Sequence, residues 1–139
     1  MNDKVRLMLD YGFSLLSKPY HWGGDDPLAG FDCSGYVQEC LASVGLDPKG
    51  DQTAQGLYDH FAAVSDREPG PGALVFFGQS SAKINHVALM VDDDHMMEYG
   101  AGNSSTTNLE QAVKQNAFGR IRPISSRSDL VAILSPRYA

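Results

Sequence analysis

A cysteine at position 33 and a histidine at position 86 are the residues of this chain best suited to nucleophilic catalysis. Cys33 follows a glycine-rich stretch and stands where a helix is expected to begin, and the helix dipole and unpaired N–H groups there favour a thiolate over a thiol. The surrounding segment, residues 30–35 (GFDCSG), leaves room around the sulfur and supplies first-turn N–H groups that would stabilise an oxyanion. An isolated cysteine is most often a buried structural thiol. The flanking segment favours a nucleophile instead.

His86 is the expected general base. It follows a polar loop, residues 78–85, and opens an apolar run that extends to Val91. A neutral imidazole near Cys33 would take the thiol proton and later deliver it to the leaving amine. A lone histidine in such a place is more often a surface or strand-end residue. The cysteine segment upstream makes the catalytic interpretation the stronger one.

Glu98 is the expected third member, which would orient His86. It lies twelve residues after His86, across a predicted hairpin turn at Asp92–Asp94, so two paired strands can bring its carboxylate beside the imidazole. A carboxylate there would hold the tautomer and stabilise the imidazolium. A solvated strand glutamate is the simpler alternative. His95 is the rival orienting residue, but it is expected within the turn itself.

The remaining cysteine and histidines predict neither a disulfide nor a metal site. If Cys33 and Cys40 share a helix, seven residues separate them by ~10 Å along its axis. A disulfide needs Cα atoms within ~7 Å, so two free thiols are expected. His21, His60 and His95 lack metal-ligand spacing with the cysteines. We therefore expect an enzyme without metal or cofactor.

The elements that must position these residues form helices first and strands afterwards. A helix capped by Asp3 is expected through about Ser17, followed by loop and turn over residues 20–32. A second helix should begin near Cys33 and end near Gly45, and a third should begin at Gln52 or Thr53. Strands are expected over residues 73–77, 86–91, 96–99, 118–124 and 130–134. This order predicts an α+β fold, with N-terminal helices packed on an antiparallel β-sheet, in a single domain of residues 1–139.

Charge and hydropathy exclude several partners. The formal net charge is -6 with a pI near 5.0, which argues against binding nucleic acid or an anionic membrane. No stretch approaches the ~18 apolar residues of a membrane span. The N-terminal residues show no signal peptide, which predicts synthesis in the cytoplasm. An anionic substrate would gain nothing from long-range attraction and would depend on local contacts.

Four ordered motifs occur at residues 19–24 (PYHWGG), 30–35 (GFDCSG), 71–77 (PGALVFF) and 86–89 (HVAL). These motifs resemble the NlpC family of cell-wall cysteine peptidases. With residues 52–55 (QTAQ) they cover about residues 1–100 in the order and spacing of the family. The tail after Asn103 matches weakly, and Ala88 stands where a glycine is common. Glu98 stands where the family most often has a second histidine.

The resemblance implies a papain-like fold and hydrolysis of amide bonds in the peptide stems of peptidoglycan, commonly after γ-D-glutamate. It implies Cys33 as nucleophile, His86 as base, and a polar third residue, which Glu98 provides. Tyr20 matches a tyrosine whose hydroxyl lies near the sulfur. Asp32 and Ser34 match positions that help to hold the stem peptide, although Asp32 is equally suited to cap the helix. Trp22 would form a wall of the substrate site or serve in packing.

Two other functions are compatible with the same residues. One is an acyltransferase or amidase that acts on a substrate outside the cell wall, because fold and triad do not determine the substrate. The other is a non-catalytic wall-binding or phage tail module, which the intact Cys33 and His86 disfavour. The absence of a leader indicates a phage or prophage protein, such as an endolysin, that reaches the wall after release or delivery.

Overall fold

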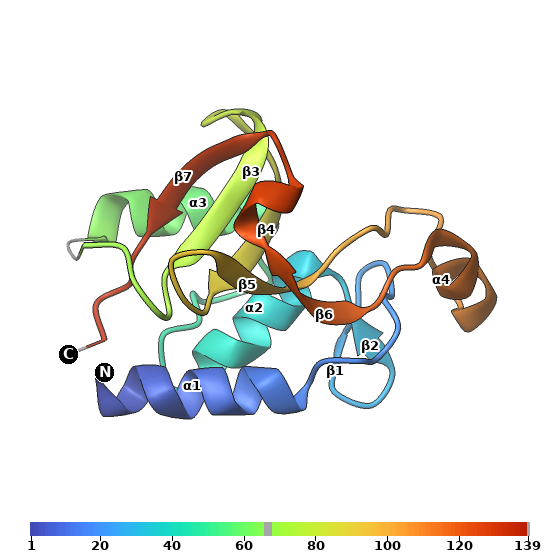
Figure 1. Ribbon diagram of the computed structural model, residues 1–139, viewed down its shortest axis with the longest axis horizontal. Helices are drawn as coiled ribbons and strands as arrows, with labels where there is room; N and C mark the ends of the chain where they lie inside the picture. Colours follow the sequence, from blue (N-terminus) through green and yellow to red (C-terminus); the bar gives the residue numbers. More distant parts are fainter. Residues whose placement is uncertain (66–67, 139) are drawn as a thin grey trace.

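The computed structural model describes residues 1–65 and 68–138, and within them the helices and strands that the sequence predicts follow one another as expected (Figure 1). The helices are α1 (Asp3–Ser14), α2 (Cys33–Ala42), α3 (Ala54–Val64), α4 (Leu109–Gln115) and the short 3₁₀ helix η1 (Ile124–Ser126). The strands are β1 (Asp25–Asp26), β2 (Gly30–Phe31), β3 (Leu74–Ser80), β4 (Lys83–Met90), β5 (His95–Tyr99), β6 (Gly119–Pro123) and β7 (Leu130–Leu134).

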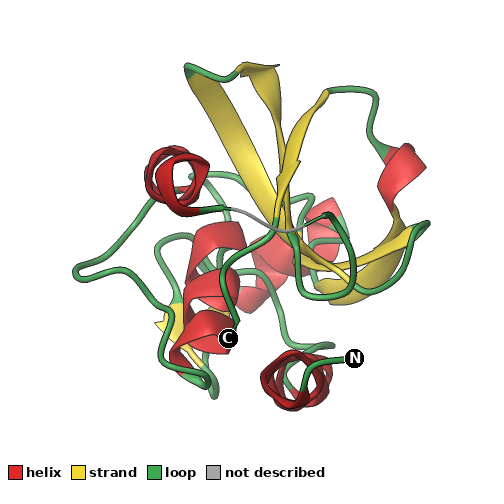
Figure 2. Cartoon of the chain, turned by 90° about the vertical axis from the view of Figure 1, so that its left-hand side faces the viewer, coloured by secondary structure: helices red, strands yellow, loops and turns green. Residues whose placement is uncertain are grey.

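The main sheet is antiparallel, with five strands in the order β6-β5-β4-β3-β7 among the described residues. Helix α2 packs against β4 and β5, α3 packs against β4 and β7, and α1 packs against α2. Figure 2 shows these helices gathered beside and below the sheet. The predicted α+β class, with N-terminal helices on an antiparallel sheet, is confirmed.

Both faces of the sheet are buried along most of its central strands, β3, β4 and β5, which explains why these strands have apolar sequences. Alternate residues of a strand point to opposite faces. Leu74 and Phe76 of β3 pack with the helices, whereas Val75 and Phe77 pack on the other face, near Ile124 of η1. From Val87 to Met90, strand β4 follows the same alternation. The sheet is therefore the rigid centre from which the side chains of β4 and β5 project.

Side-chain caps define where the first three helices begin. Asn2, Asp32 and Thr53 each accept a hydrogen bond from a first-turn N–H group, as N-cap residues do. The cap of α1 is thus Asn2 and not the predicted Asp3. Helix α1 also ends at Ser14, earlier than predicted, because the N–H of Leu15 turns back to Gly12 and Ser17 adopts a left-handed conformation (φ 73°). None of the helices in the described part of the chain is long and apolar enough to cross a membrane.

Other segments depart from the sequence prediction. The expected loop over residues 78–85 is a tight hairpin, because β3 continues to Ser80 and β4 begins at Lys83. The expected loop over residues 20–32 contains the small β1–β2 ribbon. Helix α4, capped by Asn108 and ended by the left-handed Asn116, was not predicted. In the tail, β6 and β7 complete opposite edges of the sheet, and Ala139 lies outside the described residues.

Candidate functional site

A cleft of about 640 Å³ opens where the N-terminus of α2 faces β4 and the loop after β5. Cys33 and His86 both line it. The cleft walls also include Tyr20, Trp22, Asp32, Ser34, Asn85, Arg127 and the loop of residues 100–104. The structure thus brings together, in one opening, residues that are far apart in the sequence.

Asp32 fixes the start of α2 and therefore the position of Cys33. One carboxylate oxygen accepts the N–H of Gly35 at 2.7 Å and the hydroxyl of Ser34 at 3.3 Å, and the other accepts the N–H of Gly23 at 3.1 Å. A Cβ on Gly35 would lie 2.1 Å from the carbonyl oxygen of Gly24, so only glycine permits this close approach of loop and helix. The thiol of Cys33 is partly exposed at the resulting helix N-terminus.

His86 and Glu98 form a buried pair beside the cleft. His86 Nε2 lies 2.6 Å from Glu98 Oε1, and the two residues are 4% and 3% exposed. Strands β4 and β5 pair with Leu89 opposite Met97, which places Glu98 on the same sheet face as His86 and diagonal to it. Arg122 Nε lies 3.7 Å from the second Glu98 oxygen, Oε2. The predicted proximity of His86 and Glu98 across the hairpin is what the structure shows.

The surroundings of His86 favour its protonated form. Burial by itself lowers the pKa of the imidazole, but hydrogen bonds with Cys33 and Glu98 and the charges of these two groups together raise it to about 9. Because Nε2 faces Glu98, Nδ1 is the ring nitrogen left for the Cys33 sulfur. An imidazolium between a carboxylate and a sulfur is the arrangement expected of an ion pair with a thiolate.

His95, the rival orienting residue, lies elsewhere. The sequence predicts His95 within the turn, but the structure shows it as the first residue of β5. Its Nδ1 lies 2.9 Å from Asp92 Oδ1, and both side chains are about half exposed. The pair therefore serves the Asp92–Asp94 turn, and Glu98 is the residue that contacts His86.

Tyr20 and Trp22 lie at the cleft in different environments. Tyr20 is buried, and burial, together with the charges of Cys33 and Asp32, raises the pKa of its phenol. A Cβ on Gly102 would lie 2.2 Å from the Tyr20 ring, so the loop after β5 crosses directly over this side chain. Trp22 is 51% exposed and lines the cleft. This exposure argues against a purely packing role for Trp22.

Asn85 and Arg127 are among the polar residues of the cleft that sequence reasoning missed. Asn85 precedes His86 in β4, and Arg127 follows η1, more than forty residues later. Arg127 Nη2 donates to Asn85 Oδ1 at 3.2 Å. No motif singled out Arg127, because its place in the cleft depends on the pairing of β7 with β3.

Cys40 is a structural thiol. It is fully buried in α2, and burial raises its pKa to about 12. Both cysteines are free thiols, as expected. Over residues 1–65 and 68–138, no three His, Cys, Asp or Glu side chains are grouped so that they could hold a metal ion.

Comparisons with known proteins agree on one family. The model of the NlpC/P60 family matches residues 17–122. The bifunctional muramidase/DL-endopeptidase CwlT of Bacillus subtilis is 34% identical over 110 residues, which cover 76% of this chain and 33% of that protein. The gamma-D-glutamyl-L-lysine dipeptidyl-peptidase of Bacillus cereus is 30% identical over 95 residues, covering 65% of this chain and 27% of that protein.

Solved structures show the same fold. The crystal structure of the NlpC/p60 domain of the peptidoglycan hydrolase SagA aligns with a TM-score of 0.69 and 21% identity, over 97% of this chain and 99% of that domain. The chain spans about a third or less of the length of the two curated relatives. With the family model matched over most of its length, this chain belongs to the NlpC/P60 family and has its papain-like fold.

Proposed function

We propose that this chain is a cysteine peptidase that hydrolyses amide bonds in peptidoglycan stem peptides, at a γ-D-glutamyl bond. The observation that carries the proposal is the buried His86–Glu98 pair, 2.6 Å apart, next to a partly exposed cysteine at a helix N-terminus. The names of the relatives support the substrate class. One is a DL-endopeptidase, another is a gamma-D-glutamyl-L-lysine dipeptidyl-peptidase, and SagA is a peptidoglycan hydrolase.

The proposed reaction has two steps. The Cys33 thiolate attacks the amide carbonyl carbon and forms a C–S bond, while first-turn N–H groups of α2 stabilise the oxyanion. The His86 imidazolium then protonates the leaving amine, and the C–N bond breaks. In the second step neutral His86 takes a proton from water, which attacks the thioester and releases the carboxylic acid and Cys33. Glu98 keeps His86 in the required orientation throughout.

Four residues are proposed to bind the substrate. Tyr20 would place its hydroxyl beside the reacting sulfur, and the exposed indole of Trp22 would form an apolar wall. Asp32 and Ser34 would contact the stem peptide at the start of α2. The bonds from Gly35 and Ser34 use both lone pairs of Asp32 Oδ1, but the bond from Gly23 leaves one on Oδ2, so capping and substrate contact are compatible.

Digestion of purified peptidoglycan tests the proposal. Walls with L-lysine and with diaminopimelate stems are incubated with the protein, and soluble products are identified by mass spectrometry. The control is the same protein alkylated with iodoacetamide. We expect new fragments that end in γ-D-glutamate with the active protein alone. A folded, unalkylated protein that releases no fragment from either wall would contradict the proposal and favour a different acyl substrate.

Glu98→Gln is expected to move the alkaline limit of activity to lower pH. The pKa of His86, about 9, is raised partly by Glu98, and activity should fall as the imidazolium loses its proton. Glutamine keeps a hydrogen-bonding side chain but removes the charge, so the alkaline limb of the kcat/KM profile should shift down by about one to three pH units.

The matched control is His95→Gln, which removes the other proposed orienting residue. Its exposed pair with Asp92 is separate from His86, so the alkaline limb should stay in place. A limb that moves in His95→Gln but not in Glu98→Gln would show that Glu98 does not orient His86.

A further inference from the structure

Arg127 is a charged side chain of the cleft that the proposed reaction does not use. Its Nε donates to Asp129 Oδ1 at 2.9 Å, and its Nη2 donates to Asp129 Oδ2 at 2.8 Å and to Asn85 Oδ1 at 3.2 Å. The guanidinium carbon lies 5.0 Å from the centre of the Phe77 ring. These contacts hold the planar group in one orientation, so it is already ordered before any ligand binds.

The guanidinium has donors to spare. Of its five N–H groups, three are on Nε and Nη2, whose partners are Asp129 and Asn85. Among residues 1–65 and 68–138, Nη1 has no hydrogen-bond partner, and 31% of the side chain is exposed. Two oriented donors on a cation are therefore available to a ligand.

The cleft is the side on which an anion would meet these donors. Arg127 also borders a second hollow of about 440 Å³, but there Asp93 and Asp94 would repel an anion. In the cleft, Asp32 is the only carboxylate that forms part of the described wall, and it belongs to the helix side. Arg127 belongs to the sheet side, next to Phe77 and Asn85.

The charges of Cys33 and Glu98 contribute to raising the pKa of Arg127, after the larger effect of Asp129, so the guanidinium lies within electrostatic reach of the nucleophile.

We propose that Arg127 determines specificity by binding, through Nη1, a free carboxylate of the substrate next to the scissile bond. The inference rests on the proposed function and names the group that this cleft selects. In a γ-glutamyl amide the residue that supplies the attacked carbonyl also carries an α-carboxylate, which is either free or amidated. A free carboxylate accepts charge-assisted hydrogen bonds from both Nη1 N–H groups. The amide is a weaker acceptor and presents N–H groups that Arg127 cannot accept.

The net negative charge of the protein is a further reason to expect a positively charged side chain in the cleft. The chain has a formal net charge of -6, so long-range attraction does not bring an anionic peptide to the cleft. Asp129 pairs with Arg127, so the two charges cancel for a ligand that is far away. Short-range hydrogen bonding to Arg127 is then the source of selection. We therefore expect a preference between closely related substrates and not a general affinity for anions.

The first test compares two synthetic stem peptides that differ only in a free or amidated α-carboxylate on the γ-linked D-glutamate. We expect kcat/KM of the wild type to be about 10-fold higher for the free acid, the size of effect that a charge-assisted hydrogen bond provides. Arg127→Gln should lower kcat/KM for the acid and leave the amide within a few-fold. Arg127→Lys should restore part of the preference. An equal loss for both peptides in Arg127→Gln would assign Arg127 a structural role and overturn the proposal.

The second test does not depend on peptidoglycan hydrolysis. Cys33 is alkylated with iodoacetate, which carries a carboxylate, and with iodoacetamide, its neutral counterpart. The rate ratio of iodoacetate to iodoacetamide should fall about 3- to 10-fold in Arg127→Gln, with iodoacetamide reporting any general disturbance of the thiol. Arg127→Lys should give an intermediate ratio. If the glutamine variant does not fold, the lysine variant tests the carboxylate contact in its place.

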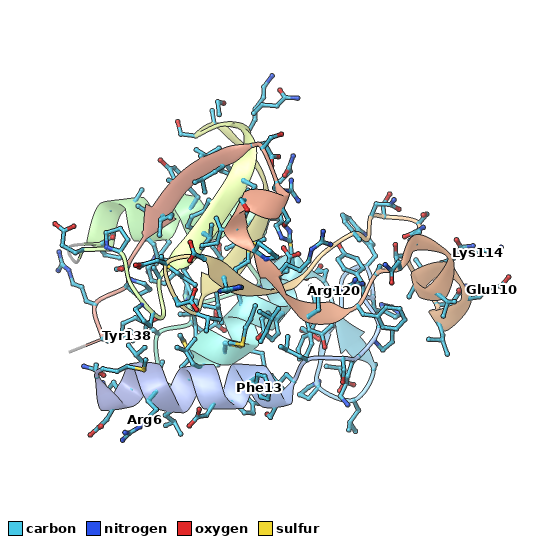
Figure 3. All side chains as sticks on the ribbon, in the orientation of Figure 1. Arg6, Phe13, Glu110, Lys114, Arg120 and Tyr138 are labelled. Atoms are coloured by element: carbon cyan, nitrogen blue, oxygen red, sulfur yellow. The ribbon has the colours of Figure 1, made fainter. Side chains whose placement is uncertain are left out.

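Arg6→Gln is the matched control. Arg6 also pairs with an aspartate, Asp3 at 3.0 Å, but it lies on α1 and points away from the rest of the molecule, as Figure 3 shows. Its alkylation ratio should equal that of the wild type. An unchanged ratio in Arg127→Gln would overturn the proposed carboxylate contact. If the wild type cleaved neither peptide while the ratio still depended on Arg127, the proposed hydrolysis would fail and the anion contact would stand.

Discussion

Cys33→Ala is expected to lower the rate of stem-peptide hydrolysis by about 10⁴-fold or more, because no covalent intermediate can form without the sulfur. The variant should fold normally, since Cys33 is partly exposed and α2 is capped by Asp32. Release of soluble fragments from purified peptidoglycan, measured at equal protein concentration, gives the rate. Binding of the stem peptide should persist, because the proposed substrate-binding side chains remain in place.

Cys40→Ala is the control for the loss of a thiol. Cys40 lies on the same helix, two turns later, and is buried in the core. Removing its sulfur leaves a small void, so we expect a lower melting temperature but unchanged activity per folded molecule. Substantial hydrolysis by Cys33→Ala, or a loss of the same size in folded Cys40→Ala, would contradict the assignment of Cys33 as nucleophile.

His86→Gln is expected to lower kcat/KM by about 10³-fold or more, since the leaving amine would lose its proton donor. Glutamine can still hydrogen-bond to Glu98, but it carries no transferable proton near neutral pH. The positive charge next to the sulfur is also lost, because the pKa of His86, about 9, keeps the imidazole protonated at pH 7. Alkylation of Cys33 by iodoacetamide at pH 7 should therefore slow together with hydrolysis.

The comparison variant is His60→Gln. His60 is an exposed residue of α3 that stacks edge-on against Phe61, outside the cleft. Its hydrolysis and alkylation rates should match those of the wild type. If His86→Gln hydrolysed the stem peptide at the wild-type rate, His86 would not be the proton donor, and the buried pair with Glu98 would serve stability alone.

Much of the site could be predicted from sequence because its signals are local. The N-caps of α2 and α3 are Asp32 and Thr53, polar residues directly before a helix, and a cap acts within three residues of itself. The apolar runs that became β3, β4 and β5 were recognised for the same reason. The interaction of Glu98 with His86 followed from one turn between two neighbouring strands, which needs no knowledge of the rest of the fold.

Elements without a local signal were missed. Helix α4 has seven residues, too few for a clear apolar period, and its Leu109 and Val113 remain exposed. The helix, which carries the labelled Glu110 and Lys114, lies beyond the sheet in Figure 3. The sequence predicts a loop where the β3–β4 hairpin lies, because the tip of the hairpin is polar and exposed even though its backbone is paired.

The sequence alone predicts the helix that begins at Cys33 and singles out Cys33 and His86, which both line the cleft, because short segments encode caps, turns and strand periodicity. Which distant segments meet depends on the tertiary structure. Strands β6 and β7 lie at opposite edges of the sheet although they are neighbours in the chain. The pairing of β7 with β3 is what places Arg127 beside Asn85, in the cleft that Cys33 also lines. Such contacts depend on the order of strands in the whole sheet, which no short segment specifies.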